Sequence, residues 1–460
     1  MSAEDCVADV AFILSECVRF REDMNRLGAS AWLKTLPKED ALSFLPDPFG
    51  KGSMICGRAA LQRLQILANI AIRNSDAAGT LSPKRVDEAL RRIVVQHFFR
   101  DKYPVNAQQV QNALAAAVDA AKSDRSDETH FVPCRLASTT EPTQFNVGPV
   151  IFRPREIFDA VIKHHVEEME EREKGAGLAS GRDRKLIEDY YGAFDWVAEV
   201  RVLNCDRDIS EERARRAACA AIDILQVVLG AGYTKRMVAG GHARANDQRT
   251  HLRLSRDGKA SLSRQWQATS PVGLSNLKEI LADPEVAFLL KSGGRAIEPI
   301  VDASLDWPVS RRLIEAASWY GEAVREEFAA ARIVKAVTAL ERLLITNEKD
   351  KKIATVSDRG AALASYPPSQ FEFAGWKDRL QLAYRLRSNL VHGSLSPFDP
   401  EVRQRSSWCV WLSAEVLKTA LGRFGVSGGL DQKVTNARLS QWFNELVAKA
   451  QSRPRPDRPS

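Results

Sequence analysis

The segment that decides the fold of the C-terminal third of the chain runs from Trp376 to Gly393, with the sequence WKDRLQLAYRLRSNLVHG. At about 100° per residue in an α-helix, its apolar side chains fall on one stripe, formed by Trp376, Leu380, Ala383, Leu390 and Val391. Arg387 falls in the middle of this stripe. Because a buried guanidinium is unfavourable without an anionic partner, this arginine requires an ion pair or an anionic ligand.

The opposite face of the same predicted helix is polar. Its members are Gln381, Arg385, Ser388 and His392. Ser388 and His392 are four residues apart, which is a contact distance on a helix surface, and Gly393 is typical of the residue that follows a helix end. Arg387 and His392 are separated by roughly 140° around an ideal helix. A distorted last turn or a second subunit is therefore needed to bring both to one phosphate.

Three sequence blocks in this region occur in a fixed order. They are Ala339–Leu344 (ALERLL), Ser357–Ala362 (SDRGAA) and Ala383–Gly393 (AYRLRSNLVHG). Over about residues 310–425 they resemble the ALExLL, SDRxA and LYxxRSxxVHG blocks of Apea-like HEPN domains. The stretch from Arg387 to His392 also resembles the R-x4-H signature of the wider HEPN ribonuclease superfamily.

The resemblance implies an all-helical domain that cleaves RNA without a metal ion, and no cofactor is expected. By this resemblance His392 transfers protons and Arg387 stabilises the phosphate in the transition state. Ser388 and Asn389 bind the phosphate or orient His392, and Glu341 holds Arg387 by an ion pair.

The resemblance also implies partners and a biological role. HEPN domains of this kind pair their motif helices about a two-fold axis, so a homodimer with a composite site is expected. The implied role is that of a toxin in antiviral defence or abortive infection, which cuts RNA such as tRNA after a phage-derived trigger.

Two interpretations of the motif remain open. In the first, the chain is an active endoribonuclease. In the second, it is a non-catalytic HEPN module for interaction or nucleic-acid binding, and Arg387 only forms a structural ion pair with Glu341.

Composition places the rest of the chain among globular proteins. The chain has 460 residues, of which 44% are hydrophobic and 27% charged, so it has enough apolar surface to form cores. No apolar stretch has the length of a membrane span. Its seven cysteines are scattered, which favours free thiols and a cytoplasmic location. We predict a mainly α, α+β fold in which an all-α bundle follows a mixed helix and strand region.

Four regions are predicted along the chain. They are a helical N-terminal region (1–125), a mixed α/β region (126–308), the HEPN helical domain (309–451) and a disordered tail (452–460). The first two regions alternatively form one domain. Short helices and loops are expected over 268–308 around Gly293 and Gly294, and Ser210 is expected to cap a helix that ends at Leu229. In the HEPN domain we expect helices over 310–320, 323–346, 357–365, 375–392, 400–423 and 436–450.

A basic segment, Lys235–Arg264, lies in the middle region and includes two strands expected over 250–255 and 259–266. Its basic residues include Lys235, Arg236, Arg244 and Arg249, and together with Arg385 they are the candidate RNA-binding residues. A solvated hairpin is the simpler interpretation and the one we favour. The chain has no P-loop, dinucleotide-binding, H-E-x-x-H or G-x-S-x-G motif, which argues against the corresponding enzyme classes.

Overall fold

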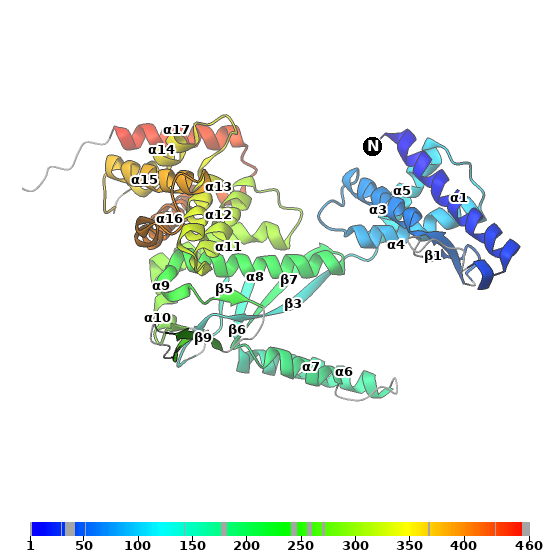
Figure 1. The fold of residues 1–460 in the computed structure, drawn as a ribbon, viewed down its shortest axis with the longest axis horizontal. Helices are drawn as coiled ribbons and strands as arrows, with labels where there is room; N and C mark the ends of the chain where they lie inside the picture. Colours follow the sequence, from blue (N-terminus) through cyan, green and yellow to red (C-terminus); the bar gives the residue numbers. More distant parts are fainter. Residues whose placement is uncertain are drawn as a thin grey trace, which may run out of the picture. The chain divides into compact units, whose positions relative to one another are not determined.

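The structure is a computed structural model of the chain (Figure 1). It describes residues 2–28, 30–32, 42–50, 52–141, 143–175, 182–240, 246–254, 260–268, 272–366, 369–427 and 429–452. The predicted disordered tail lies outside these residues apart from Ser452, which caps the last helix. The chain forms two compact units, Met1–Glu128 with Val202–Glu212, and Thr129–Arg201 with Arg213–Ser460. The finer division predicted at residue 309 stays a prediction.

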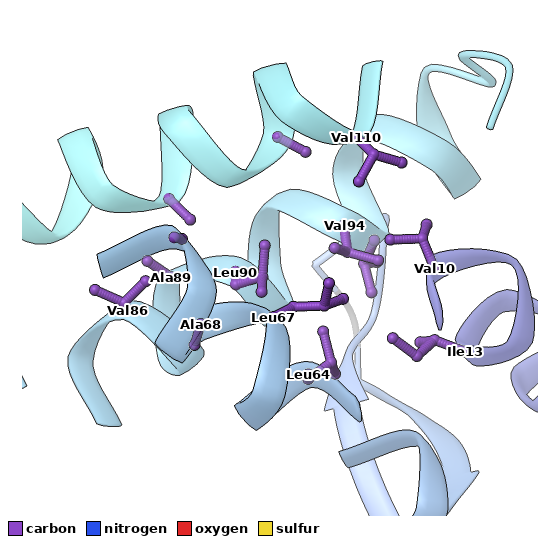
Figure 2. Packing of buried hydrophobic residues seen from close by; sticks show 14 of the residues in the cluster. Val10, Ile13, Leu64, Leu67, Ala68, Val86, Ala89, Leu90, Val94 and Val110 are labelled. Carbon is purple, nitrogen blue, oxygen red and sulfur yellow. The ribbon is translucent and has the colours of Figure 1, made fainter. Parts of the chain in front are cut away.

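Unit 1 is a helical bundle with one β-hairpin. Its elements are α1 (Ala3–Leu27), β1 (Leu42–Pro46), β2 (Ser53–Gly57), α3 (Arg58–Arg73), α4 (Pro83–Val94), the π-helical turn η1 (Val95–Arg100) and α5 (Ala107–Lys122). Its core is aliphatic: Val10, Leu64, Leu67, Leu90 and Val94 pack together between the helices (Figure 2). The antiparallel β1–β2 hairpin was not predicted, because each strand has only five residues.

The start of α8 (Arg207–Leu229) differs from the prediction. The cap is Asp206 rather than Ser210, since the Asp206 carboxylate accepts a hydrogen bond from the Ile209 amide at 2.9 Å. Its second oxygen accepts one from the Ser82 amide at 2.5 Å. Ser210 is buried in the first turn. One aspartate thus accepts hydrogen bonds from backbone amides at the N-terminal ends of two helices. Residue spacing within one helix does not predict a cap that is shared in this way.

Unit 2 begins with a five-stranded sheet in the order β5-β6-β7-β3-β8. The strands are β3 (Ser126–Arg135), β5 (Phe145–Val147), β6 (Val150–Pro154), β7 (Trp196–Cys205) and β8 (Val238–Ala239). Helix α8 crosses one face of this sheet, and the hairpin of α6 (Arg155–Gly175) and α7 (Arg182–Tyr191) extends away from it (Figure 1). A separate antiparallel pair is formed by β9 (Asn246–Leu254) and β10 (Ala260–Ala268). These bounds overlap those of the two strands predicted over 250–255 and 259–266.

The expectation of short helices and loops over 268–308 is wrong for its second half. After the short α10 (Leu277–Ala282), α11 runs unbroken over Pro284–Val301, through both glycines. A Cβ on Gly294 would lie 2.3 Å from the backbone nitrogen of Gly148 in the β5–β6 turn. A Cβ on Gly293 would lie 2.4 Å from Ile224 of α8. These glycines permit close packing of the helix and do not break it.

The C-terminal part of unit 2 is built from helices only, and it confirms the predicted mainly α, α+β fold class. The helices are α12 (Pro308–Arg325), α13 (Ala329–Leu344), α14 (Lys352–Ala364), α15 (Phe373–Val391), α16 (Pro400–Ser427) and α17 (Asn436–Gln451). All six were predicted, and their ends differ from the prediction by up to six residues, the largest difference being at the start of α13. Helix α13 is central, because it packs against α12, α14, α15 and α16.

Two further expectations from the sequence concern disulfide bonds and membrane spans. None of the seven cysteines, all of them within the described ranges, forms a disulfide. Among the helices that the structure describes, none is both long and apolar enough to cross a membrane.

Candidate functional site

Helix α15 carries the motif, and its inward face largely follows the predicted stripe. Trp376, Leu380 and Ala383 are buried against the neighbouring helices. The prediction is wrong for Val391, whose exposed fraction is 52%. The physical reason is that the packed part of α15 ends earlier, and residues 391–394 are all exposed.

Arg387 lies on the packed side of α15 and forms the ion pair that the sequence suggested. Its Nη2 lies 2.8 Å from Oε2 of Glu341 on α13. The exposed fractions of the two side chains are 22% and 13%. The pair is therefore half-buried, in a setting where a lone guanidinium would be costly.

Tyr384 completes this cluster from one turn earlier on α15. Its hydroxyl donates a hydrogen bond of 2.7 Å to Oε1 of Glu341, so both carboxylate oxygens have a donor. Burial raises the pKa of Tyr384 to about 12, and the hydrogen bond to Glu341 contributes further. The phenol therefore stays a protonated donor at neutral pH and helps to fix the carboxylate that holds Arg387. Sequence reasoning missed this role, although the spacing of three residues from Arg387 was a usable signal.

The guanidinium of Arg387 retains unused donors. Its Nε is buried and has no hydrogen-bond partner in the part of the chain that the structure describes. Arginine carries five N–H donors in a fixed planar fork, and the hydrogen bond to Glu341 uses Nη2. A buried donor without a partner is destabilising by about 1–3 kcal/mol.

His392 caps the C-terminus of α15, and its side chain is exposed. Its amide donates to the Ser388 carbonyl at 2.9 Å, and the chain then turns through Gly393 at φ +76°, which a glycine adopts without strain. Ser388 is half-buried, whereas Asn389 and Arg385 are exposed. The imidazole is accordingly available to a ligand in solution.

The structure of a single chain brings Arg387 to Glu341, but it does not bring Arg387 to His392. Among the described residues, no hydrogen bond or ion pair joins these two side chains. Arg387 contacts α13, while His392 lies in the exposed last turn. The separation expected from the helical wheel therefore persists in the structure.

The basic segment gives no assembled site. Lys235 is exposed and Arg236 is half-buried, just after the short helix α9 (Ala231–Thr234). Arg244 lies outside the described residues, and for Arg249 the structure describes the backbone in β9 alone. Their role in RNA binding stays a prediction. Within the described ranges, no three His, Cys, Asp or Glu side chains are grouped so that they would hold a metal ion.

Arg359, in the middle of the second sequence block, has a role that sequence reasoning missed. It is buried, and its Nη1 donates to the Leu344 carbonyl at 2.6 Å and to the Thr346 hydroxyl at 2.9 Å. Its Nη2 donates to the Ser440 hydroxyl at 2.9 Å. Arg359 thus caps the end of α13 and connects it to α17, which is a structural task.

Comparison of the chain with family models, curated proteins and solved structures gives no match.

Proposed function

We propose that the C-terminal helices form a HEPN-type endoribonuclease that cleaves RNA without a metal ion. The observation that carries this proposal is the state of Arg387. This half-buried guanidinium is oriented by Glu341, has a buried Nε without a partner among the described residues, and lies one turn before the exposed His392. Buried donors normally have a partner, and among the described residues Arg85, Arg91 and Arg155 are the other arginines with a buried nitrogen that lacks one.

The proposed chemistry uses the RNA's own 2′-hydroxyl as the nucleophile. The 2′-oxygen forms a bond to the adjacent phosphorus, and the bond from phosphorus to the 5′-oxygen breaks. The products are a 2′,3′-cyclic phosphate and a 5′-hydroxyl. His392 accepts the proton of the 2′-hydroxyl or donates one to the leaving oxygen, a role that suits an imidazole near neutral pH. Selectivity for RNA follows, because DNA has no 2′-hydroxyl.

Arg387 supplies the cationic group in this mechanism. Its planar fork of donors matches the oxygens of a phosphate, and donors that are already oriented stabilise charge that develops in the transition state. Glu341 and Tyr384 position the guanidinium, while Ser388 and Asn389 are placed in the same turn to bind the phosphate or orient His392.

The proposed active form is a homodimer in which the ends of two α15 helices meet. This assembly brings Arg387 of one subunit towards the same phosphate as the partner copy of His392. Val391 within the motif and Phe398 after it are exposed apolar side chains, at 52% and 93%, and in the proposed dimer the interface covers them.

By resemblance, the biological role of this nuclease is antiviral defence through abortive infection. A phage-derived trigger releases cleavage of RNA such as tRNA, and the preceding residues bind the trigger or the RNA.

The test is RNA cleavage by the purified full chain in EDTA, with and without extract from phage-infected cells. Wild type is expected to produce 2′,3′-cyclic phosphate ends. His392→Ala and Arg387→Ala should each lower the rate by about 100-fold or more. Arg438→Ala is the matched control, because it removes the same charge from an exposed position on another helix, α17. Absence of cleavage by wild type in both conditions, or equal rates for all four proteins, contradicts the proposal.

A second candidate function is a non-catalytic interaction module. The observation that favours it is that Glu341 already neutralises Arg387, which has no contact with His392 within the described chain. In that case wild type binds RNA or a protein partner and leaves RNA intact, and His392→Ala has no effect on cell growth.

A further inference from the structure

A second concave site is lined by residues other than the motif cluster of Arg387, Glu341 and Tyr384. It is a cavity of about 630 Å³ within unit 2. It is lined by the end of α8, the loop through α9, and helices α12, α13 and α16. Its volume falls in the range of pockets that bind small molecules.

Charge in this cavity is predominantly positive. Lys235, Arg332 and Lys418 line it, and Glu415 is the acidic residue among the lining side chains. Among the described residues neither lysine is part of an ion pair, while Arg332 donates through Nε and Nη2 to the Glu326 carbonyl. Three cations against one carboxylate favour an anionic ligand, and a phosphate group carries about −1.5 to −2 charges at neutral pH.

One residue that lines the cavity carries a buried polar group without a hydrogen-bond partner. Tyr320 is fully buried and lines the cavity, and its hydroxyl has no hydrogen-bond partner among the described residues. Burial raises the pKa of this phenol, and the negative charge of Glu415 raises it further. The hydroxyl is therefore a neutral donor and acceptor close to Glu415. A ligand atom at this position would satisfy it.

An aromatic side chain forms another part of the wall. Trp411 of α16 lines the cavity, and one face of its indole stacks on Trp376 with ring centroids 5.7 Å apart. Trp376 belongs to α15, the motif helix. An indole fixed in this way gives a rigid surface for a planar group such as a nucleobase.

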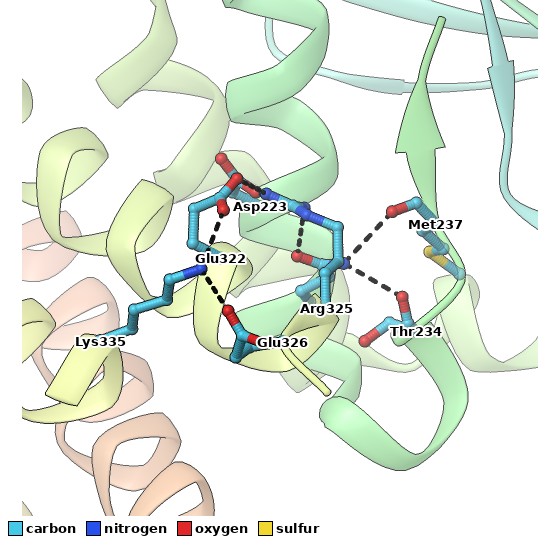
Figure 3. Close-up of polar contacts among 8 residues, drawn as sticks. Asp223, Thr234, Met237, Glu322, Arg325, Glu326 and Lys335 are labelled. Carbon is cyan, nitrogen blue, oxygen red and sulfur yellow. Dashed lines mark hydrogen bonds and ion pairs between the residues drawn. The ribbon is translucent and has the colours of Figure 1, made fainter. Parts of the chain in front are cut away.

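A polar network connects two of the helices that line this cavity, α8 and α12 (Figure 3). Arg325 of α12 donates to Asp223 and to Gln226 of α8, both at 2.9 Å. Gln226 in turn donates to the carbonyls of Thr234 and Met237 at 3.0 and 3.3 Å. The loop that supplies Lys235 is thereby tied to α8.

We propose that this cavity binds a nucleotide, with its phosphate at Lys235, Arg332 and Lys418, its base against Trp411, and a polar atom at the Tyr320 hydroxyl. The site is separate from the proposed nuclease centre. Its occupancy does not require that the chain cleave RNA.

The test is isothermal titration calorimetry of the full chain with the four ribonucleoside monophosphates, with adenosine and with inorganic phosphate. At least one monophosphate should bind, while adenosine and inorganic phosphate should each bind at least about tenfold more weakly. Lys418→Ala and Lys235→Ala should each weaken binding of that monophosphate by about tenfold. Tyr320→Phe removes one hydroxyl and keeps the ring, and it should also weaken binding.

Two control variants separate this site from other parts of the chain. Lys449→Ala removes an exposed lysine of α17 that does not line the cavity, and it should bind like wild type. Arg387→Ala shows instead whether the nucleotide binds at the motif cluster. Retained affinity in this variant supports the separate cavity, and loss of affinity assigns the nucleotide to the motif cluster and overturns the proposal. Absence of binding by all four monophosphates overturns the proposal. Equal affinities of wild type, Lys418→Ala and Tyr320→Phe overturn it as well.

Discussion

Two arginines that contact the same helix, α13, differ in how completely their donors are used. Arg359 is buried and donates to the Leu344 carbonyl and to two hydroxyls, those of Thr346 and Ser440. Arg387 donates to Glu341 and has a buried Nε without a partner among the described residues. Both lie in sequence blocks that resemble the same family. From this difference we infer a structural role for Arg359, while the ligand-binding role of Arg387 is part of the proposal.

The largest effect on the free energy of unfolding is expected from a change at Arg359. Arg359→Ala leaves the Leu344 carbonyl without its donor and opens a space between α13 and α17, and we expect a loss of about 4 kcal/mol in the free energy of unfolding. Urea denaturation of the full chain measures it. A loss below about 1 kcal/mol would remove the structural side of the comparison.

A third arginine, Arg325, forms an ion pair with Asp223. It resembles Arg387 in having a carboxylate partner, and it resembles Arg359 in that this interaction is buried. Burial raises the pKa of Asp223 to about 7, against the opposing attraction of Arg325. The folded state then holds a proton that the unfolded state releases near pH 4. The contribution of Asp223 to stability is therefore complete below about pH 4 and is lost as the pH rises through about 7.

Asp223→Asn tests this pH dependence. Between pH 5 and pH 8 the wild type should lose on the order of 2 kcal/mol relative to the variant. Urea midpoints of both proteins at four pH values give the difference. A difference that stays constant with pH, or that grows in favour of wild type, contradicts the assignment.

Changes around Arg387 should lower the free energy of unfolding less than Arg359→Ala does, and they should lower the rate of RNA cleavage more. Glu341→Gln weakens a half-buried ion pair, and we expect a loss of about 1 kcal/mol in stability. RNA cleavage should fall by about tenfold or more, because Arg387 is no longer oriented. Glu315→Gln is the matched control. It breaks the ion pair of Glu315 with Arg342, which lies on α13 next to Glu341 and is part of a more exposed pair. If both variants behave alike, Glu341 has no positioning role.

The smallest effect is expected from Tyr384→Phe. This change removes one hydrogen bond to Glu341 and keeps the ring, so stability should fall by about 1 kcal/mol or less. Cleavage should fall severalfold and should not be abolished. Loss of cleavage as complete as in Arg387→Ala would assign Tyr384 a direct part in the reaction.

The apolar patterns of the sequence predicted the existence of the helices of the C-terminal region, because the apolar stripes are long and regular. They failed where a partner far along the chain decides the outcome. Gly293 and Gly294 suggest a break, but contacts with Gly148 and Ile224 give them a place inside a helix. The R-x4-H spacing and the resemblance identified Arg387 and Glu341 as a pair. No spacing rule distinguishes Arg387 from Arg359, since the number of satisfied donors depends on the tertiary structure.

The most direct test of the central claim is a mixing experiment with two inactive proteins. Arg387→Ala and His392→Ala chains are unfolded together, refolded and purified as dimers. In a composite site, half of the dimers are mixed and each mixed dimer has one intact site out of two, so about a quarter of wild-type cleavage should return. A mixture that forms dimers but stays as inactive as either variant alone, next to an active wild type treated in the same way, would contradict the claim that Arg387 and His392 act on one phosphate across two subunits.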